Sequence, residues 1–174
     1  MNTANKITLF RVALIPVFVI ICYLPYGWAQ YAALGVFVLA SLSDFADGYI
    51  ARHYNQITDF GKFLDPIADK LLVTSAMCLF VEQGRMPAWV LLAVVAREFA
   101  VSGLRLVAVD NGRVIAAGWS GKVKTACTMV GICLMLLLRM DALDLAVNAV
   151  ILVTTVWSGV EYFVKNHDVL NPEK

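Results

Sequence analysis

The chain has 174 residues and a formal net charge of +1, and 60% of its residues are hydrophobic while 16% are charged. With a mean hydropathy of +0.75 it is too apolar for a soluble domain of this length, so the composition indicates a polytopic membrane protein. The sequence has no basic stripe interleaved with aromatic residues, which argues against a nucleic-acid-binding protein. The cysteines lie inside apolar runs without CxxC spacing, which favours packing over a disulfide or zinc framework; they are Cys22, Cys78, Cys127 and Cys133.

Six apolar segments approach the length of roughly 20 residues that a helix needs to cross the core of a bilayer. They are separated by short connections rich in turn-forming residues, such as LPYGW, EQGRMP and MDALD. We therefore predict an all-α membrane protein with six transmembrane helices, in a single domain that covers residues 1–174. The predicted helices are residues 7–24, 31–54, 61–82, 87–109, 118–139 and 143–165.

Lysine and arginine residues are distributed unevenly among the predicted connections. Short loops that carry these cations remain on the cytoplasmic side of a membrane. The first, third and fifth connections offer only Arg85 and Arg139, so we expect the other two connections and both termini to be cytoplasmic. The cations on that side are Lys6, Arg11, Arg52, Lys62, Arg113, Lys122, Lys124, Lys165 and Lys174.

Two pairs of aspartates lie near the connection between the second and third predicted helices. Asp44 and Asp47 are three residues apart, and Asp65 and Asp69 are four apart. On a helix either spacing puts both side chains on one face, about 5–6 Å from each other. Each aspartate inside a span would cost roughly 2.5–3.5 kcal/mol, so four of them need a compensating charge. Carboxylates without His or Cys favour Mg²⁺, Mn²⁺ or Ca²⁺, and two such ions would balance the four charges. The spacing therefore predicts a metal site at the cytoplasmic ends of these two helices.

Small residues accompany the aspartates. Gly48 and Ala51 follow Asp47 on the same predicted helix, where they would allow a second backbone or a flat ligand to approach closely. Gly61 opens the third predicted helix.

Pro66 bears on where the third helix begins. We expect this helix to start near Lys62 or Phe63, because the ring of Pro66 would then fall in its first turn, where no backbone donor is missed. Asp59 would then be a loop or cap residue.

The fourth predicted helix contains Arg97 next to Glu98. Adjacent residues on a helix point in different directions, which argues against a direct ion pair between them. The alternatives are that Arg97 and Glu98 satisfy each other or that groups on neighbouring helices satisfy them.

Taken together, the residues of the second and third helices form the pattern Asp44-x2-Asp47-Gly48-x2-Ala51-Arg52-x8-Gly61-x3-Asp65-x3-Asp69. At all eight positions it resembles the signature of the CDP-alcohol phosphatidyltransferase family. The flanking stretches NKITLFRVALIPVF, AREFAVSGLR and GKVKT look like the branch of this family that produces phosphatidylglycerophosphate. The resemblance covers residues 5–125.

This resemblance implies a homodimeric enzyme of the bacterial inner (plasma) membrane that transfers the phosphatidyl group from CDP-diacylglycerol to sn-glycerol 3-phosphate and releases CMP. It also implies two divalent cations, Mg²⁺ or Mn²⁺. Asp44, Asp47, Asp65 and Asp69 would be the metal ligands, and Asp69 would also be the general base for the acceptor hydroxyl. The residues expected to contact CDP-diacylglycerol are Gly48, Ala51, Arg52 and Gly61. For Arg52, an ion pair with one of the aspartates is an equal alternative.

The acceptor of this reaction is a phosphate dianion, so its pocket needs cations near the metals. The basic residues from the end of the fourth predicted helix onward are candidates, although the bias toward cytoplasmic cations alone would explain those of the following loop. A guanidinium can bind phosphate through two donors at once, and Lys122 and Lys124 cannot face the same way on one helix. The candidate residues are Arg105, Arg113, Lys122, Lys124 and Thr125.

Three alternatives stay open. Within the family, the acceptor could be serine or inositol phosphate. A membrane cation transporter would also use aspartates, but we would expect them to be spread through the depth of the membrane. A prenyl-type transferase would be expected to show adjacent aspartates in a DDxxD arrangement, which this sequence lacks.

Overall fold

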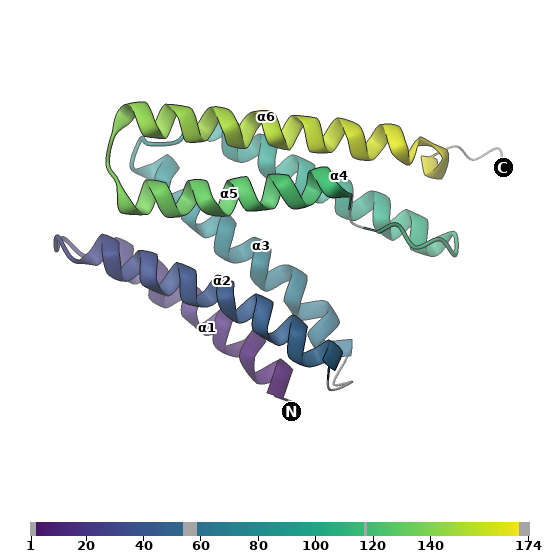
Figure 1. Ribbon diagram of the computed structural model, residues 1–174, viewed down its shortest axis with the longest axis horizontal. Helices are drawn as coiled ribbons and strands as arrows, with labels where there is room; N and C mark the ends of the chain where they lie inside the picture. Colours follow the sequence, from purple (N-terminus) through teal and green to yellow (C-terminus); the bar gives the residue numbers. More distant parts are fainter. Residues whose placement is uncertain (1–2, 54–58, 117, 171–174) are drawn as a thin grey trace. The chain divides into compact units, whose positions relative to one another are not determined.

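The computed structural model describes the backbone of residues 3–53, 59–116 and 118–170, and the side chains of residues 7–43, 67–68, 70–116 and 118–169. All regular structure in the described residues is helical (Figure 1). These residues form α1 (Thr3–Cys22), α2 (Ala29–His53), α3 (Asp59–Glu82), α4 (Ala88–Asp110), α5 (Trp119–Leu137), α6 (Asp141–Lys165) and the 3₁₀ helix η1 (His167–Leu170).

The all-α prediction is confirmed for this part of the chain, and each predicted helix overlaps an observed one. The start of α3 was predicted wrongly. α3 begins at Asp59, which places Pro66 two turns inside the helix instead of in its first turn. α1 likewise contains Pro16 in its interior. Proline costs a helix one backbone hydrogen bond, and apolar helices tolerate it where neighbouring groups satisfy the freed carbonyl.

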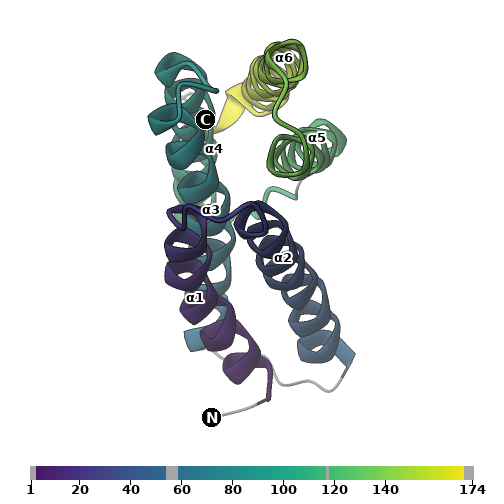
Figure 2. The same cartoon turned by 90° about the vertical axis from the view of Figure 1, so that its left-hand side faces the viewer.

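The chain divides into two compact units, and the first comprises Met1–Gln83 with Ile132–Arg139. Within it, α1 contacts both α2 and α3 (Figure 2). The buried residues of α2 recur at helical spacing, so one stripe of this apolar helix faces the core. Phe18 of α1 packs against Phe37 of α2 with ring centroids 5.8 Å apart. The Tyr23 hydroxyl after α1 donates a hydrogen bond to Glu82 at the end of α3. The buried stripe of α2 is Ala29, Ala33, Phe37 and Ala40.

The second unit comprises Gly84–Gly131 with Met140–Lys174, so α5 contributes residues to both units. Its main contact is between α4 and α6. The buried stripe of α6 contains polar as well as apolar side chains, so this helix makes hydrogen bonds as well as apolar contacts. It consists of Asp144, Val147, Asn148, Ile151, Thr155, Ser158 and Tyr162.

An ion pair connects the beginning of the second unit to α6. Arg85 donates from Nε and Nη2 to the two oxygens of Asp144, each at 2.7 Å. The amide of Asn148 donates to the carbonyl of Arg85 at 2.9 Å. These bonds attach the turn before α4 to the first turns of α6, with the charged groups satisfied by each other.

α4 ends in a glycine-dependent turn. Gly112 has φ of 71°, a left-handed conformation that a side chain would disfavour. Its N–H bonds to the carbonyl of Val109 at 2.9 Å, and the N–H of Arg113 bonds to that of Ala108 at 2.8 Å, which is the Schellman arrangement. Beyond it, η1 packs against α4, with Val169 near the buried side chains of Val101, Leu104 and Tyr162.

Among the residues that the structure describes, α5 and α6 are long and apolar enough to cross a membrane, and shorter apolar stretches occur at Ile7–Cys22 and Ala29–Ser43. Large apolar side chains are also exposed on the outside of the helices, such as Leu145, Val153 and Val160 on α6. Tyr26 and Trp28 stack on each other in the turn between α1 and α2, with ring centroids 5.7 Å apart. These features indicate a membrane protein, since exposed apolar surface needs lipid and aromatic rings favour its boundary.

Gly131 of α5 leaves room for the side chain of Val147 on α6. A Cβ at this position would lie 2.7 Å from Cγ1 of Val147, whose branched side chain has little freedom to move. We therefore expect Gly131→Ala to destabilise the protein by about 1–3 kcal/mol, because overpacking forces a backbone shift.

The measurement is the unfolding midpoint of purified protein in a denaturing-detergent titration. Gly103→Ala is the matched control, because a Cβ at Gly103 on α4 meets nothing within 4 Å. That replacement should be neutral or stabilising by up to about 1 kcal/mol. Equal midpoints for the two variants would contradict the role assigned to Gly131.

Candidate functional site

The residues of the aspartate signature lie on two helices of the first unit. Residues 44–52 occupy the last turns of α2, and residues 61–69 occupy the first turns of α3. α2 contacts α3. Figure 1 shows the end of α2 and the beginning of α3 at the same end of this unit. The backbone thus brings the two segments into one region.

Both aspartate pairs have helical backbone, so each pair shares a helix face, Asp44 with Asp47 and Asp65 with Asp69. Their side chains lie outside the described residues, as do those of Gly48, Ala51, Arg52 and Gly61. Among the side chains that are described, no group of three or more His, Cys, Asp or Glu could hold a metal ion. The convergence of the four carboxylates stays a prediction.

Arg11 is a buried charge that the sequence analysis counted among the cations of the cytoplasmic N-terminus. It lies inside α1, where its side chain is fully buried and Thr8, three residues earlier, is buried beside it on the same face. A charge inside an apolar segment is costly and is therefore a functional hypothesis by default. The position of Arg11 within the run ITLFRVALIPVF was the signal that could have identified it.

In the second unit, three charged side chains form one network, in which Lys124 is buried and Arg97 and Glu98 are partly buried. Oε1 of Glu98 accepts hydrogen bonds from Nη1 of Arg97 at 3.1 Å and from Nζ of Lys124 at 2.7 Å. Nη2 of Arg97 donates to the hydroxyl of Ser158 on α6 at 2.5 Å. The network therefore joins α4, α5 and α6. Arg97 and Glu98 satisfy each other and are also satisfied by neighbouring helices. The direct pair, which their adjacency argued against, forms because the long arginine side chain can reach the carboxylate of its neighbour although the two Cβ atoms point apart.

Two glycines make room for the arginine of this network. A Cβ on Gly121 of α5 would lie 3.4 Å from Nη2 of Arg97, and a Cβ on Gly159 of α6 would lie 3.4 Å from its Cγ. Both distances are ordinary van der Waals contacts, so a Cβ at either position would touch the arginine side chain. The sequence thus allows a bulky, charged group to lie between two helices.

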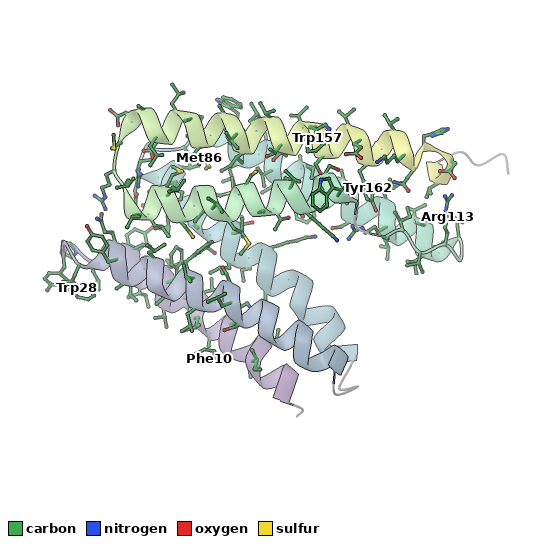
Figure 3. The ribbon with its side chains drawn as sticks, viewed as in Figure 1. Phe10, Trp28, Met86, Arg113, Trp157 and Tyr162 are labelled. Carbon is green, nitrogen blue, oxygen red and sulfur yellow. The ribbon has the colours of Figure 1, made fainter. Side chains whose placement is uncertain are left out.

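The other candidate cations of the acceptor pocket have separate surroundings. Nε of Arg105 donates to the hydroxyl of Tyr162 at 2.9 Å, and its guanidinium lies 5.5 Å from the centre of that ring. Arg113 follows the end of α4 and pairs with Asp168 of η1 (Figure 3). Because Asp110 at the end of α4 is thirteen residues beyond Arg97, Arg113 lies ~20 Å along the helix axis from the Arg97 backbone.

Two further candidates flank the buried lysine on α5. Lys122 is exposed, whereas Lys124 is 4% exposed, which confirms that the two lysines face different ways. The hydroxyl of Thr125 donates to the carbonyl of Gly121 at 3.0 Å. The five predicted acceptor-pocket residues are thus placed in at least two locations rather than one.

The guanidinium of Arg113 lowers the pKa of Asp168 below its ordinary value, chiefly by hydrogen bonding to the carboxylate. A depressed carboxyl pKa stabilises the folded form above the ordinary pKa of about 3.9, and this stabilisation is lost as the pH falls through the lower, folded value.

We therefore expect Arg113→Gln to raise the pKa of Asp168 toward its ordinary value, measured as the pH midpoint of its carboxyl carbon by NMR. Arg105→Gln is the control and should leave this midpoint unchanged, because Arg105 contacts Tyr162. A midpoint that is insensitive to the loss of Arg113 would show that the ion pair does not form in solution.

The model of the CDP-alcohol phosphatidyltransferase family matches residues 1–159, so the chain belongs to this family and is a phosphatidyltransferase. Its curated relatives include a protein of Bacillus subtilis (strain 168) that is 43% identical, with 97% of each chain covered. Proteins of Escherichia coli (strain K12) and Shigella flexneri serotype 5b are each 41% identical, with 92% of each chain covered. All three relatives are named CDP-diacylglycerol–glycerol-3-phosphate 3-phosphatidyltransferase.

Proposed function

We propose that this protein transfers the phosphatidyl group of CDP-diacylglycerol to sn-glycerol 3-phosphate, giving phosphatidylglycerophosphate and CMP. The observation that carries this proposal is the similarity to relatives of that name over nearly the whole of both chains. The motifs AREFAVSGLR and GKVKT, which favoured this acceptor in the sequence, lie on α4 and α5.

The signature residues fit two divalent cations, Mg²⁺ or Mn²⁺. All four donors are carboxylates, they lie in pairs on two helices in contact, and their oxygens are the ligands that hard cations prefer. Asp44, Asp47, Asp65 and Asp69 would hold them. When bound, such ions supply positive charge for the diphosphate of the substrate and for the leaving oxygen of CMP.

The chain's own part in the reaction is to align the substrates and to take up a proton. The acceptor hydroxyl attacks the phosphorus attached to the lipid, the bond from that phosphorus to CMP breaks, and Asp69 takes the hydroxyl proton as general base. Gly48, Ala51 and Gly61 leave space for the CDP group, and Arg52 contributes a cation beside it.

We propose that the acceptor phosphate is bound by cations drawn from Arg105, Arg113, Lys122 and Lys124, together with Thr125. Arg113 pairs with Asp168 through Nη1, which leaves its other guanidinium donors for the phosphate. Lys124 lies in the buried network and Lys122 on the exposed side of α5, so the two lysines cannot contribute equally.

The membrane arrangement that we propose has six spans in a single domain, with both termini and the active site on the cytoplasmic side of a bacterial inner membrane. It is supported by the uneven distribution of lysine and arginine and by the apolar helices. We propose a homodimer by family resemblance.

The decisive experiment is acceptor competition with purified protein, CDP-diacylglycerol and Mg²⁺. We expect CMP release to depend on sn-glycerol 3-phosphate, to yield phosphatidylglycerophosphate as identified by mass spectrometry, and to stop when a chelator removes the metal. Product formation with serine or inositol phosphate instead would reassign the acceptor. Cation flux without CMP release would replace the enzyme proposal by a transporter.

Asp69→Asn tests the general base. The amide cannot accept a proton at neutral pH, so we expect kcat to fall by about 10²–10⁴-fold. Asp59→Asn is the control, because Asp59 lies outside the signature and should leave kcat within a factor of about two. If Asp69→Asn retains wild-type kcat, a different group accepts the proton.

A further inference from the structure

Glu98 brings two cationic groups together inside the second unit. Because Nη1 of Arg97 and Nζ of Lys124 contact the same oxygen, they can be no farther apart than the sum of the two hydrogen-bond distances. The side chains of Arg97 and Lys124 are 12% and 5% exposed, so neither cation is solvated like a surface charge. The three side chains together carry one positive charge.

We propose that Glu98 is a positioning residue that holds the ammonium group of Lys124, with Arg97 beside it, for the phosphate of the acceptor. This inference deepens the proposed function and rests on it. It assigns Lys124 a fixed place in the acceptor pocket, and it gives Arg97 and Glu98 a role in acceptor binding that does not require either of them to touch the reacting atoms.

The flexibility of lysine is the reason that such a residue is needed. An ammonium group on a four-carbon stem has many rotamers, and fixing it costs conformational entropy at each binding event unless the protein has already fixed it. A charge-assisted hydrogen bond of 2.7 Å to a carboxylate fixes the position of the group before substrate arrives. An ammonium has three donors, so a bond to Glu98 leaves the group able to donate to phosphate as well.

The anchoring of the carboxylate is also built into the fold. Arg97 holds Glu98 from the same helix and reaches Ser158 on α6, in the space that Gly121 and Gly159 provide. The carboxylate that positions the lysine is therefore itself fixed between three helices.

The test is a steady-state analysis of Glu98→Gln in the full-length, detergent-solubilised protein. The amide keeps the shape of the side chain and an acceptor oxygen but removes the negative charge, so the ammonium group of Lys124 is held by a much weaker hydrogen bond. We expect the KM for sn-glycerol 3-phosphate to rise about tenfold, the loss typical of a hydrogen bond to a charged group, while the KM for CDP-diacylglycerol stays within about twofold.

Asp144→Asn is the matched control. It removes a carboxylate from another buried pair of the same unit, with Arg85, and Asp144 precedes Ser158 by fourteen residues of α6, or ~21 Å of helix. It should lower the unfolding midpoint and leave the KM for sn-glycerol 3-phosphate within about twofold, because loss of stability alone does not change acceptor binding.

If Glu98→Gln does not fold, Glu98→Asp tests the positioning role instead. It keeps the charge and shortens the side chain by one methylene, so we expect a smaller increase in the same KM. An unchanged KM in folded Glu98 variants, an equal rise for both substrates, or an equal rise in Asp144→Asn would overturn the positioning role. Wild-type protein that makes no phosphatidylglycerophosphate would instead refute the proposed function, before any variant is compared.

Discussion

The structure depends on one constraint, the free-energy cost of placing a charged side chain among apolar helices. In the second unit this cost is met by pairing. Arg85 and Asp144 form a bidentate pair, and Glu98 accepts hydrogen bonds from both Arg97 and Lys124. The helices that carry these groups are consequently joined at defined points, because an unpaired member would be far more costly than a missing apolar contact. The charges determine which positions of α4, α5 and α6 face one another, and apolar packing fills the space between them.

Much of the helical fold could be predicted because long apolar segments and turn-forming residues leave few alternatives. The start of α3 could not be predicted, because we expected Pro66 to lie in the first turn of the helix, whereas α3 begins earlier, at Asp59. Capping and proline preferences are local, and the packing of neighbouring helices can override them. The helical setting of the aspartate pairs followed from the apolar segments that contain them, and their spacing then indicated that each pair shares one helix face.

The buried network on α4, α5 and α6 could not be predicted in the same way. Spacing along a helix says nothing about Lys124, which lies 26 residues from Glu98 and reaches it from another helix. The adjacency of Arg97 and Glu98 even argued against their contact. The ion pair of Arg113 could not be predicted either, because its partner Asp168 is far away in the sequence, near the C-terminal end of the second unit. Contacts among three side chains from different helices require the tertiary structure.

The pairing of Arg85 with Asp144 has a consequence for the order of assembly. Asp144 is in the first turn of α6, and Arg85 belongs to the turn between α3 and α4. Neither charge can leave water cheaply until the other is present, so the beginning of α6 docks only after that earlier turn has formed. Because the chain is synthesised from its N-terminus, Arg85 is made before Asp144. The turn that carries Arg85 is therefore already in place when α6 packs against it.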